Sequence, residues 1–273
     1  MTTSLQTRLA TEWQALRLQG RRHGNLVTST DLIKALALIN MVMDHLGFFF
    51  FPDEPMWRAV GRIGVPVWLF LAGYARPSRM SLWLPAGGFF LLAVDVSLGR
   101  PLFPLNILFT IMLTRWVVQF IPVQRVLNDI LLLMALPLFA VAAYFYSNLF
   151  LEYGTVGLLL GIWGRIMREA PDSWARRLFA LLCLAVFLFL QQLVGEFKVF
   201  AYLVMCAGVT FTFGWLYVFQ PRIYPASESW YGLAPVVRFL GRHTLGFYVW
   251  HLTLFTLLWA WLNPAEIKGF HWF

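Results

Sequence analysis

The chain is organised as a succession of apolar segments, most of them close to the length of a lipid bilayer. A helix needs about 20 predominantly apolar residues to cross the hydrocarbon core. Only 12% of the residues are charged and 60% are hydrophobic, whereas a water-soluble domain carries roughly 25% charged residues. The polar surface is too small to cover a soluble globule. The sequence therefore predicts an all-α, polytopic membrane helical bundle.

We expect about nine transmembrane helices, within a range of roughly eight to ten, from the lengths of the apolar segments. No internal repeat is visible, so residues 31–273 are predicted to form a single transmembrane domain. The nine predicted segments are 31–51, 58–74, 81–97, 103–121, 129–147, 152–168, 177–195, 198–218 and 244–262.

Residues 1–30 contain no apolar run of the kind found in a cleavable signal peptide. Leu5, Leu9, Trp13 and Leu16 follow helical spacing, and four arginines surround them. We expect an amphipathic helix on the cytoplasmic surface of the membrane. A partly disordered, soluble tail is the alternative.

The net charge of +8 is spread over short clusters between the apolar segments. This distribution orients helices in a bilayer and argues against nucleic-acid binding. Alternate loops are rich in arginine, which predicts a cytoplasmic N-terminus and an external C-terminus. Two cysteines, both in apolar segments, provide no disulfide framework and no metal-ligand spacing. The arginines of the predicted inner loops are Arg76, Arg79, Arg125, Arg165, Arg168, Arg176, Arg177, Arg222, Arg238 and Arg242.

The first apolar segment contains ionisable residues, which are costly at membrane depth and usually mark a functional site. Lys34 and His45 are eleven residues apart, so they share one helix face and lie roughly 16 Å apart along the axis. Lys34 is predicted near the cytoplasmic surface and His45 deeper in the membrane. His45 is a candidate proton acceptor because its unperturbed pKa is near neutrality. The alternative is a structural histidine that is hydrogen-bonded between helices.

Asp44 points about 100° away from His45 around the helix, so the two do not form a ready-made pair. An unpaired aspartate is expensive in a membrane, and we expect Asp44 to pair with Arg62 on the second helix. Arg58 lies four residues before Arg62 and is expected to extend to the outer surface. Gly61 and Gly64 are expected to allow close approach of these helices.

Other polar residues are candidates for binding substrates. Asn106, Glu152, Tyr153 and His251 are candidates for holding an acceptor amine or hydroxyl, although Glu152 also fits a solvated charge at a helix N-terminus. His251 alone also fits a packing role. Arg76 and Arg79 are candidates for binding phosphate groups, or they only anchor the helix ends at the cytoplasmic surface.

The order of these motifs resembles the TraX family, which is associated with N-terminal acetylation of conjugative pilin. The resemblance covers most of the chain and rests on five stretches. They are Asp31 to Lys34 with Met43 to His45; Gly61 to Pro66 with Phe70 to Tyr74; Asn106 to Thr110; Glu152 to Gly157; and Tyr248 to Leu252.

TraX proteins are in turn similar to wider transmembrane acyltransferases, including the acyltransferase 3 group and heparan-alpha-glucosaminide N-acetyltransferase. Lys34, Ala37, Met41 and His45 match the first-helix pattern of the acyltransferase 3 group, with lysine in place of its arginine. Lysine keeps the charge but loses bidentate phosphate recognition.

The resemblance implies transfer of an acetyl or other acyl group from cytoplasmic acyl-CoA to an amine or hydroxyl at the membrane or its outer face. On this resemblance we expect the acceptor to be a pilin N-terminus, a glycan or a lipid headgroup, and the protein to lie in the bacterial inner membrane. We expect neither a metal nor a nucleic acid to be involved. His45, as base or acyl relay, with Asp44 and Arg62, is the expected catalytic group. Lys34, Arg76 and Arg79 are expected to bind the donor.

Two other functions remain open. In the first, Asp44, His45 and Arg62 form the proton relay of a small transporter, although the lack of an internal repeat counts weakly against this. In the second, the protein is an assembly partner of a membrane complex, and its polar residues hold helices together.

Overall fold

The structure, a computed structural model, describes residues 26–76, 80–224, 230 and 232–264. It is mostly helical, with one two-stranded ribbon. The amphipathic helix predicted for the N-terminal segment 1–30 falls in residues 1–25, which lie outside the described part of the chain. Arg79 also lies outside the described residues.

The first long helix begins at Ser29, two residues before the start of the predicted segment 31–51. The Thr28 side chain accepts a hydrogen bond from the backbone of Asp31, and the Asp31 carboxylate accepts one from the backbone of Thr28, which forms a capping box. The elements are β1 (Val27–Thr28), α2 (Ser29–Phe50), α3 (Pro55–Arg62), α4 (Val65–Tyr74), α5 (Trp83–Ser97), α6 (Ile107–Val117), η1 (Val118–Phe120), α7 (Val123–Asn128), α8 (Ile130–Ala142), α9 (Tyr144–Asn148), α10 (Gly154–Glu169), α11 (Trp174–Gly195), α12 (Val199–Tyr217), β2 (Ile223–Tyr224), α13 (Leu233–Arg242) and α14 (Thr244–Leu262).

Each of the nine predicted segments contains a helix or most of one. Four of these helices, α2, α11, α12 and α14, are long and apolar enough to cross a membrane. The apolar helices α5, α6 with η1, and α8 are shorter. The helical membrane-protein class is thus supported, and the count of about nine spanning helices stays a prediction.

The prediction of one continuous helix over residues 58–74 is wrong. The chain forms α3 and α4 instead, with a turn at Ile63 and Gly64 between them. Pro66 lies in the first turn of α4 and has no backbone N–H to donate to the preceding turn, which explains the break. The predicted segment 129–147 is likewise divided, into α8 and α9.

The centre of the bundle is the crossing of α4 and α10. A side chain at Gly73 would place its Cβ only 1.7 Å from the carbonyl oxygen of Gly161, so the two backbones touch. Trp163 of α10 is fully buried and stacks on Phe213 of α12, with ring centroids 4.5 Å apart. This packing fixes α10, and therefore the loop before it, relative to the other helices.

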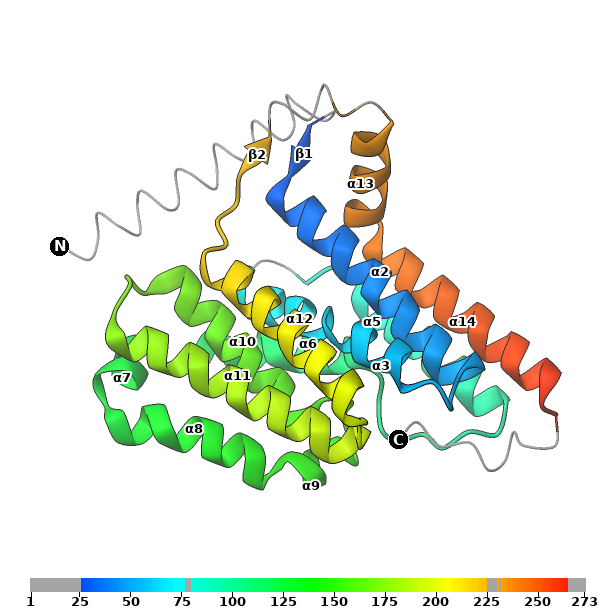
Figure 1. The fold of residues 1–273 in the computed structure, drawn as a ribbon, viewed down its shortest axis with the longest axis horizontal. Coiled ribbons are helices and arrows are strands. Elements are labelled where there is room, and N and C mark those ends of the chain that lie inside the picture. Colours follow the sequence, from blue (N-terminus) through cyan, green and yellow to red (C-terminus); the bar gives the residue numbers. More distant parts are fainter. Residues whose placement is uncertain (1–25, 77–79, 225–229, 231, 265–273) are drawn as a thin grey trace.

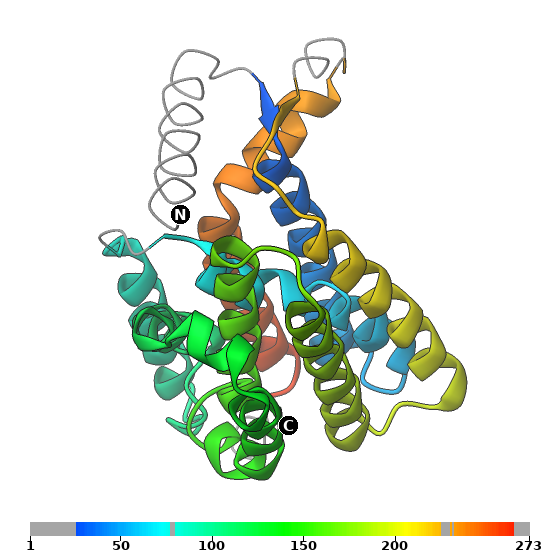
Figure 2. The ribbon, with the colours of Figure 1, turned by 90° about the vertical axis from the view of Figure 1, so that its left-hand side faces the viewer.

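Figure 1 shows two groups of helices around this crossing: α7, α8, α9 and α11 on one side, and α2, α3, α5 and α14 on the other. At one end, β1 and β2 form an antiparallel ribbon in which Val27 pairs with Tyr224. α13 packs beside them against α2. Figure 2 shows the ribbon and α13 together at the end of the bundle away from α9.

Candidate functional site

Two histidines from opposite ends of the chain meet where α2 contacts α14. The Nδ1 atom of His45 lies 2.7 Å from Nε2 of His251. The Nδ1 atom of His251 lies 2.5 Å from the carbonyl oxygen of Phe247, one turn earlier in α14. Tyr248 packs against both imidazole rings, with centroids 6.1 Å and 5.9 Å away. His45 and Tyr248 are buried, so this cluster is part of the protein interior.

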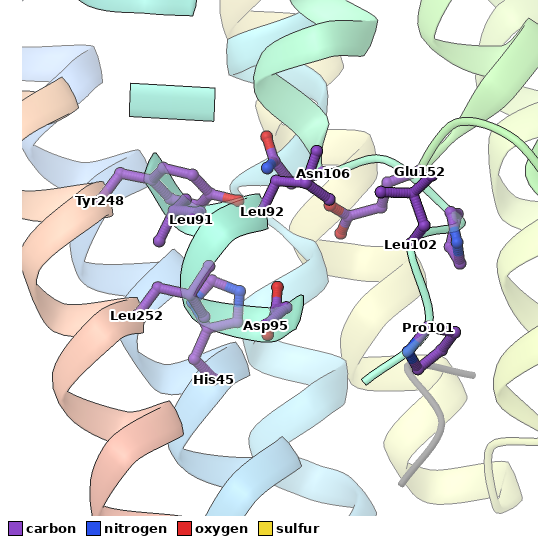
Figure 3. A pocket seen from close by; sticks show the side chains of 11 residues that line it. His45, Leu91, Leu92, Asp95, Pro101, Leu102, Asn106, Glu152, Tyr248 and Leu252 are labelled. Carbon is purple, nitrogen blue, oxygen red and sulfur yellow. The ribbon is translucent and has the colours of Figure 1, made fainter. Parts of the chain in front are cut away.

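His45 also lines a small cavity of about 30 Å³, enclosed by α2, α5, α14 and the loops that precede α6 and α10. A space of this size holds about one water molecule. In Figure 3, Tyr248 and Glu152 extend toward the middle of the cavity from opposite sides, and the His45 ring lies beside Asp95. The polar side chains that line the cavity are His45, Asp95, Asn106, Glu152 and Tyr248.

The loop before α10 brings Glu152 to this cavity by pairing with the segment before α6. The backbone N–H of Glu152 donates to Leu105, and the Glu152 carboxylate accepts a 2.9 Å hydrogen bond from the backbone of Ile107. Ile107 is the first residue of α6. A carboxylate is favourable at this position because the N-terminus of a helix carries partial positive charge. Glu152 thus caps α6 rather than α10, the helix that follows it in the chain.

Asn106 has a structural role at the same helix start. Its side-chain oxygen accepts a hydrogen bond from the backbone of Leu108, and its amide donates to the carbonyl of Gly88 at 3.1 Å. Asn106 therefore ties α6 to α5 while it lines the cavity.

A second polar cluster lies between α2 and α3. The Asp44 carboxylate is 2.9 Å from Nη1 of Arg58 and 3.4 Å from Nε of Arg62. The predicted Asp44–Arg62 pair is therefore present, as an ion pair without hydrogen-bond geometry. The close approach depends on Gly61, because a Cβ there would lie 2.3 Å from Cβ of Asp44.

The expectation that Arg58 extends to the outer surface is wrong. Its guanidinium donates to the Asp44 carboxylate instead, and its side chain is only 21% exposed. A buried carboxylate attracts both cations because each would otherwise lack a counter-charge.

Tyr153 belongs to this second cluster. Its hydroxyl accepts a hydrogen bond from Arg62, and it is not among the residues that line the cavity. Tyr153 has a left-handed backbone with φ of 63°. This conformation turns the chain so that the Glu152 side chain reaches the cavity and the Tyr153 side chain reaches Arg62. Glu152 and Tyr153, two of the four residues predicted to hold the acceptor, thus lie at different sites: Glu152 at the cavity and Tyr153 at the second polar cluster.

The ion pair between Asp95 and Arg100 was missed from the sequence. Asp95 lines the cavity, and its Oδ1 lies 3.1 Å from Nη1 of the buried Arg100. Arg100 also packs on the rings of Phe49 and Trp259. Asp95 lies in the otherwise apolar segment 81–97. The rule that singled out Asp44 would also have found Asp95, since both are ionisable residues in an apolar helix.

A basic pocket of about 130 Å³ lies among α4, α6, η1 and α10, and its arginines are Arg76, Arg115, Arg165 and Arg168. Arg168 donates hydrogen bonds to the last carbonyls of α4, and Arg165 pairs with Glu169. Within the described part of the chain, no hydrogen bond from the Arg115 guanidinium is found. Lys34 lies near Asp31 and Arg115, close enough for both to act on it electrostatically.

The cavity and the basic pocket lie at opposite ends of α6. Asn106, just before the helix, lines the cavity, and Arg115, in its last turn, lines the pocket. Nine residues of helix separate them, which corresponds to roughly 13 Å. A long, thin molecule held by its anionic end at the pocket would therefore need to extend about this far to reach the cavity that His45 lines.

Comparison with known proteins gives one match to a protein family and one to a short segment. A stretch of 50 residues is 44% identical to an uncharacterized protein of Rickettsia prowazekii; it makes up 18% of this chain and 20% of that relative. The chain thus matches about a fifth of the relative's length. No solved structure matches the chain. The family described as "TraX protein" matches residues 29–259, a range that includes both clusters and the basic pocket. The chain therefore belongs to the TraX family.

Proposed function

We propose that this protein is a membrane acyltransferase that moves an acetyl or other acyl group from acyl-CoA to an acceptor amine. The observation that carries the proposal is His45, which is buried, hydrogen-bonded to His251 and placed at the wall of a polar cavity. Membership in the TraX family, which is associated with pilin modification, is consistent with it. By the distribution of arginines, the N-terminus lies in the cytoplasm and the basic pocket faces the same side, in a bacterial inner membrane.

His45 acts as the general base in this proposal. As the acceptor nitrogen attacks the thioester carbon, a new C–N bond forms and the nitrogen loses a proton to the imidazole. The C–S bond then breaks, and the thiolate leaves and takes up the proton from His45. General-base assistance of this kind contributes roughly 100- to 10,000-fold to a rate. The cavity admits only the reacting atoms, so both substrates must widen it as they bind.

The carboxylates favour an amine as acceptor. Glu152 lines the cavity, and its carboxyl group can accept a hydrogen bond from one N–H of a neutral amine while the other N–H is given up to His45. Asp95 also lines the cavity but is paired with Arg100, so Glu152 has the larger effect. A pilin N-terminus fits this preference better than a glycan or lipid hydroxyl.

The Asp44–Arg58–Arg62 cluster supplies positive charge near the reacting groups. Arg58 and Arg62 lie close enough to His45 to act on it electrostatically. Arg62 is held by Asp44 and by the hydroxyl of Tyr153, so its position is fixed before substrates bind. Fixed charge of this kind stabilises the oxyanion that forms during acyl transfer. Asp44 and Tyr153 are therefore positioning residues for Arg62.

The basic pocket is the proposed site for the phosphates of acyl-CoA. Its four arginines provide the donors that phosphate groups require. The roughly 13 Å along α6 between pocket and cavity suits the extended pantetheine arm that carries the thioester. Lys34 adds positive charge near Arg115.

The test is to incubate the purified protein in lipid nanodiscs with radiolabelled acetyl-CoA and measure release or transfer of the label. The expected result is turnover in the wild type and none in His45→Gln. His243→Gln is the matched control, because His243 is an exposed histidine at the start of α14, away from the cavity. It is expected to retain full activity.

Each outcome decides between functions. Full activity in His45→Gln would refute the role of His45. No turnover with acetyl-CoA, longer acyl-CoA or added amine, together with substrate uptake into proteoliposomes, would support a transporter. A His45→Gln variant that is poorly expressed, from an inactive parent, would support an assembly role.

A further inference from the structure

The hydrogen bonds around the histidine pair determine where each proton lies. The backbone carbonyl of Phe247 can only accept, so the Nδ1 atom of His251, 2.5 Å away, must carry hydrogen. A neutral imidazole carries hydrogen on one nitrogen only. The Nε2 atom of neutral His251 is therefore an acceptor.

We infer that His251 is a positioning residue that locks His45 in the tautomer with hydrogen on Nδ1. The only polar atom opposite His45 Nδ1 in this contact is the acceptor Nε2 of His251, 2.7 Å away, so Nδ1 must donate. The Nε2 atom of His45 is then left with a free lone pair. This unprotonated nitrogen is the one that can accept a proton, and His45 lines the cavity.

The packing keeps the two rings in this relation. The His45 and His251 rings are inclined to each other by 28°, with centroids 5.0 Å apart and their hydrogen-bonded nitrogen atoms facing each other. Phe255 packs edge-on against His251 at 5.5 Å, and Tyr248 packs against both rings. His251 and Phe247 are four residues apart on α14, so the helix itself provides the anchor. A rotation of the His251 ring would break both hydrogen bonds, whereas a rotation of the His45 ring would break only the bond between the two imidazoles.

The inference concerns the tautomer itself, and only its catalytic consequence rests on the proposed function. A histidine with hydrogen on Nε2 cannot act as a base through that atom. A change of tautomer would therefore reduce turnover without removing the imidazole. His251 supplies no atom to the substrate in this scheme and acts through His45.

Solid-state NMR of the full-length protein, labelled with ¹⁵N-histidine and embedded in lipid bilayers, tests the tautomer directly. The signals of His45 are assigned as those lost in His45→Gln. Protonated and unprotonated ring nitrogens have well-separated ¹⁵N shifts, and the proton–nitrogen couplings identify the position. The expected result is a neutral His45 with protonated Nδ1 and unprotonated Nε2. Protonated Nε2 in the wild type would overturn the inference, whether or not the protein has enzymatic activity.

Two substitutions of His251 separate positioning from packing. In His251→Leu, which keeps the bulk but has no acceptor, His45 is expected to lose its single tautomer. In His251→Gln, the side-chain carbonyl can accept from Nδ1, and the wild-type tautomer is expected to return. An unchanged His45 signal in a folded His251→Leu protein would overturn the inference. If His251→Leu does not fold, the His45 tautomer measured in the wild type and in His251→Gln still tests the inference.

Kinetics supply the second readout if the wild type is active. His251→Leu is expected to lower kcat by roughly 100-fold or more, the scale of general-base catalysis, with little change in KM. His251→Gln is expected to recover a large part of this loss. Equal kcat in the wild type and His251→Leu would overturn the catalytic consequence. An inactive wild type with the expected tautomer would refute the proposed function alone.

Discussion

Asp44→Asn removes one negative charge from between two arginines and changes the shape of the side chain very little. Asp44 and Arg62 are both buried, and Asp44 also pairs with Arg58 at 2.9 Å. After the substitution, Arg62 keeps its hydrogen bond to Tyr153 but has no counter-charge within ion-pair distance in the described part of the chain. The variant therefore measures the cost of a stranded buried cation.

The magnitude follows from the burial of each partner. Two opposite charges about 4 Å apart attract by about 4 kcal/mol at an effective dielectric constant of 20. Removal of one member of a buried pair destabilises a protein by about 3–5 kcal/mol. Arg58 is partly exposed and can be rehydrated, so Arg62 accounts for most of the loss. The lower end, about 3 kcal/mol, corresponds to a fall in Tm of roughly 6–12 °C for a chain of this size.

Thermal unfolding in detergent, followed by size-exclusion chromatography or intrinsic tryptophan fluorescence, measures this change. Asp53→Asn is the matched control, because Asp53 is exposed in the loop after α2. Adding Arg62→Gln to Asp44→Asn removes the stranded cation and is expected to cost less than the sum of the two single changes. A Tm for Asp44→Asn equal to that of Asp53→Asn, or strict additivity in the double variant, would refute the reasoning.

Three further changes test other parts of the structure. Gly73→Ala is expected to reduce the yield of folded protein strongly, because the added Cβ would lie 1.7 Å from a carbonyl oxygen of α10. Gly214→Ala is the neutral control, because open space surrounds Gly214. The detergent-soluble yield of each variant measures the effect. Arg115→Gln is expected to raise the KM for acyl-CoA and leave kcat unchanged, and an unchanged KM would contradict donor binding at the basic pocket. Hydrogen bonds from Arg177 and a tyrosine hydroxyl hold the pKa of Asp172, in the loop before α11, below its usual range. The ionised Asp172 therefore contributes to folding stability above the unfolded pKa of about 3.9, and this contribution is lost as the pH falls through the lower folded pKa. Asp172→Asn is expected to flatten the acid limb of a plot of Tm against pH.

Local sequence patterns were enough to place the helices and one of the two polar clusters. Apolar length located a helix in each predicted segment. Helical geometry separated Asp44 from His45, and the cost of an unpaired charge predicted the pairing of Asp44 with Arg62. Both inferences depend on residues within one helix or on neighbouring helices, where spacing along the chain limits the distance in space.

Other local features were misjudged because a second local effect outweighed the first. The segment 58–74 is apolar enough for one helix, but Pro66 breaks it. Arg58 is near a helix end and was expected to reach the surface, but the carboxylate of Asp44 holds it. Asp95 was overlooked, although an ionisable residue in an apolar helix is itself a signal.

The sequence by itself determined that this is a helical membrane protein of the TraX family, and it identified His45 as the residue with the most suitable chemistry. Only the tertiary structure decided which atoms surround that histidine. His251 lies 206 positions further along the chain, and Glu152 reaches the cavity by capping a helix that is not its own. Apolar length and helical periodicity describe one helix at a time. The relative rotation and depth of the helices come from close contacts such as Gly61 of α3 on Asp44 of α2, Gly157 of α10 on Thr110 of α6, and Gly87 of α5 on Val249 of α14. Side-chain packing, and not hydropathy, fixes how membrane helices meet.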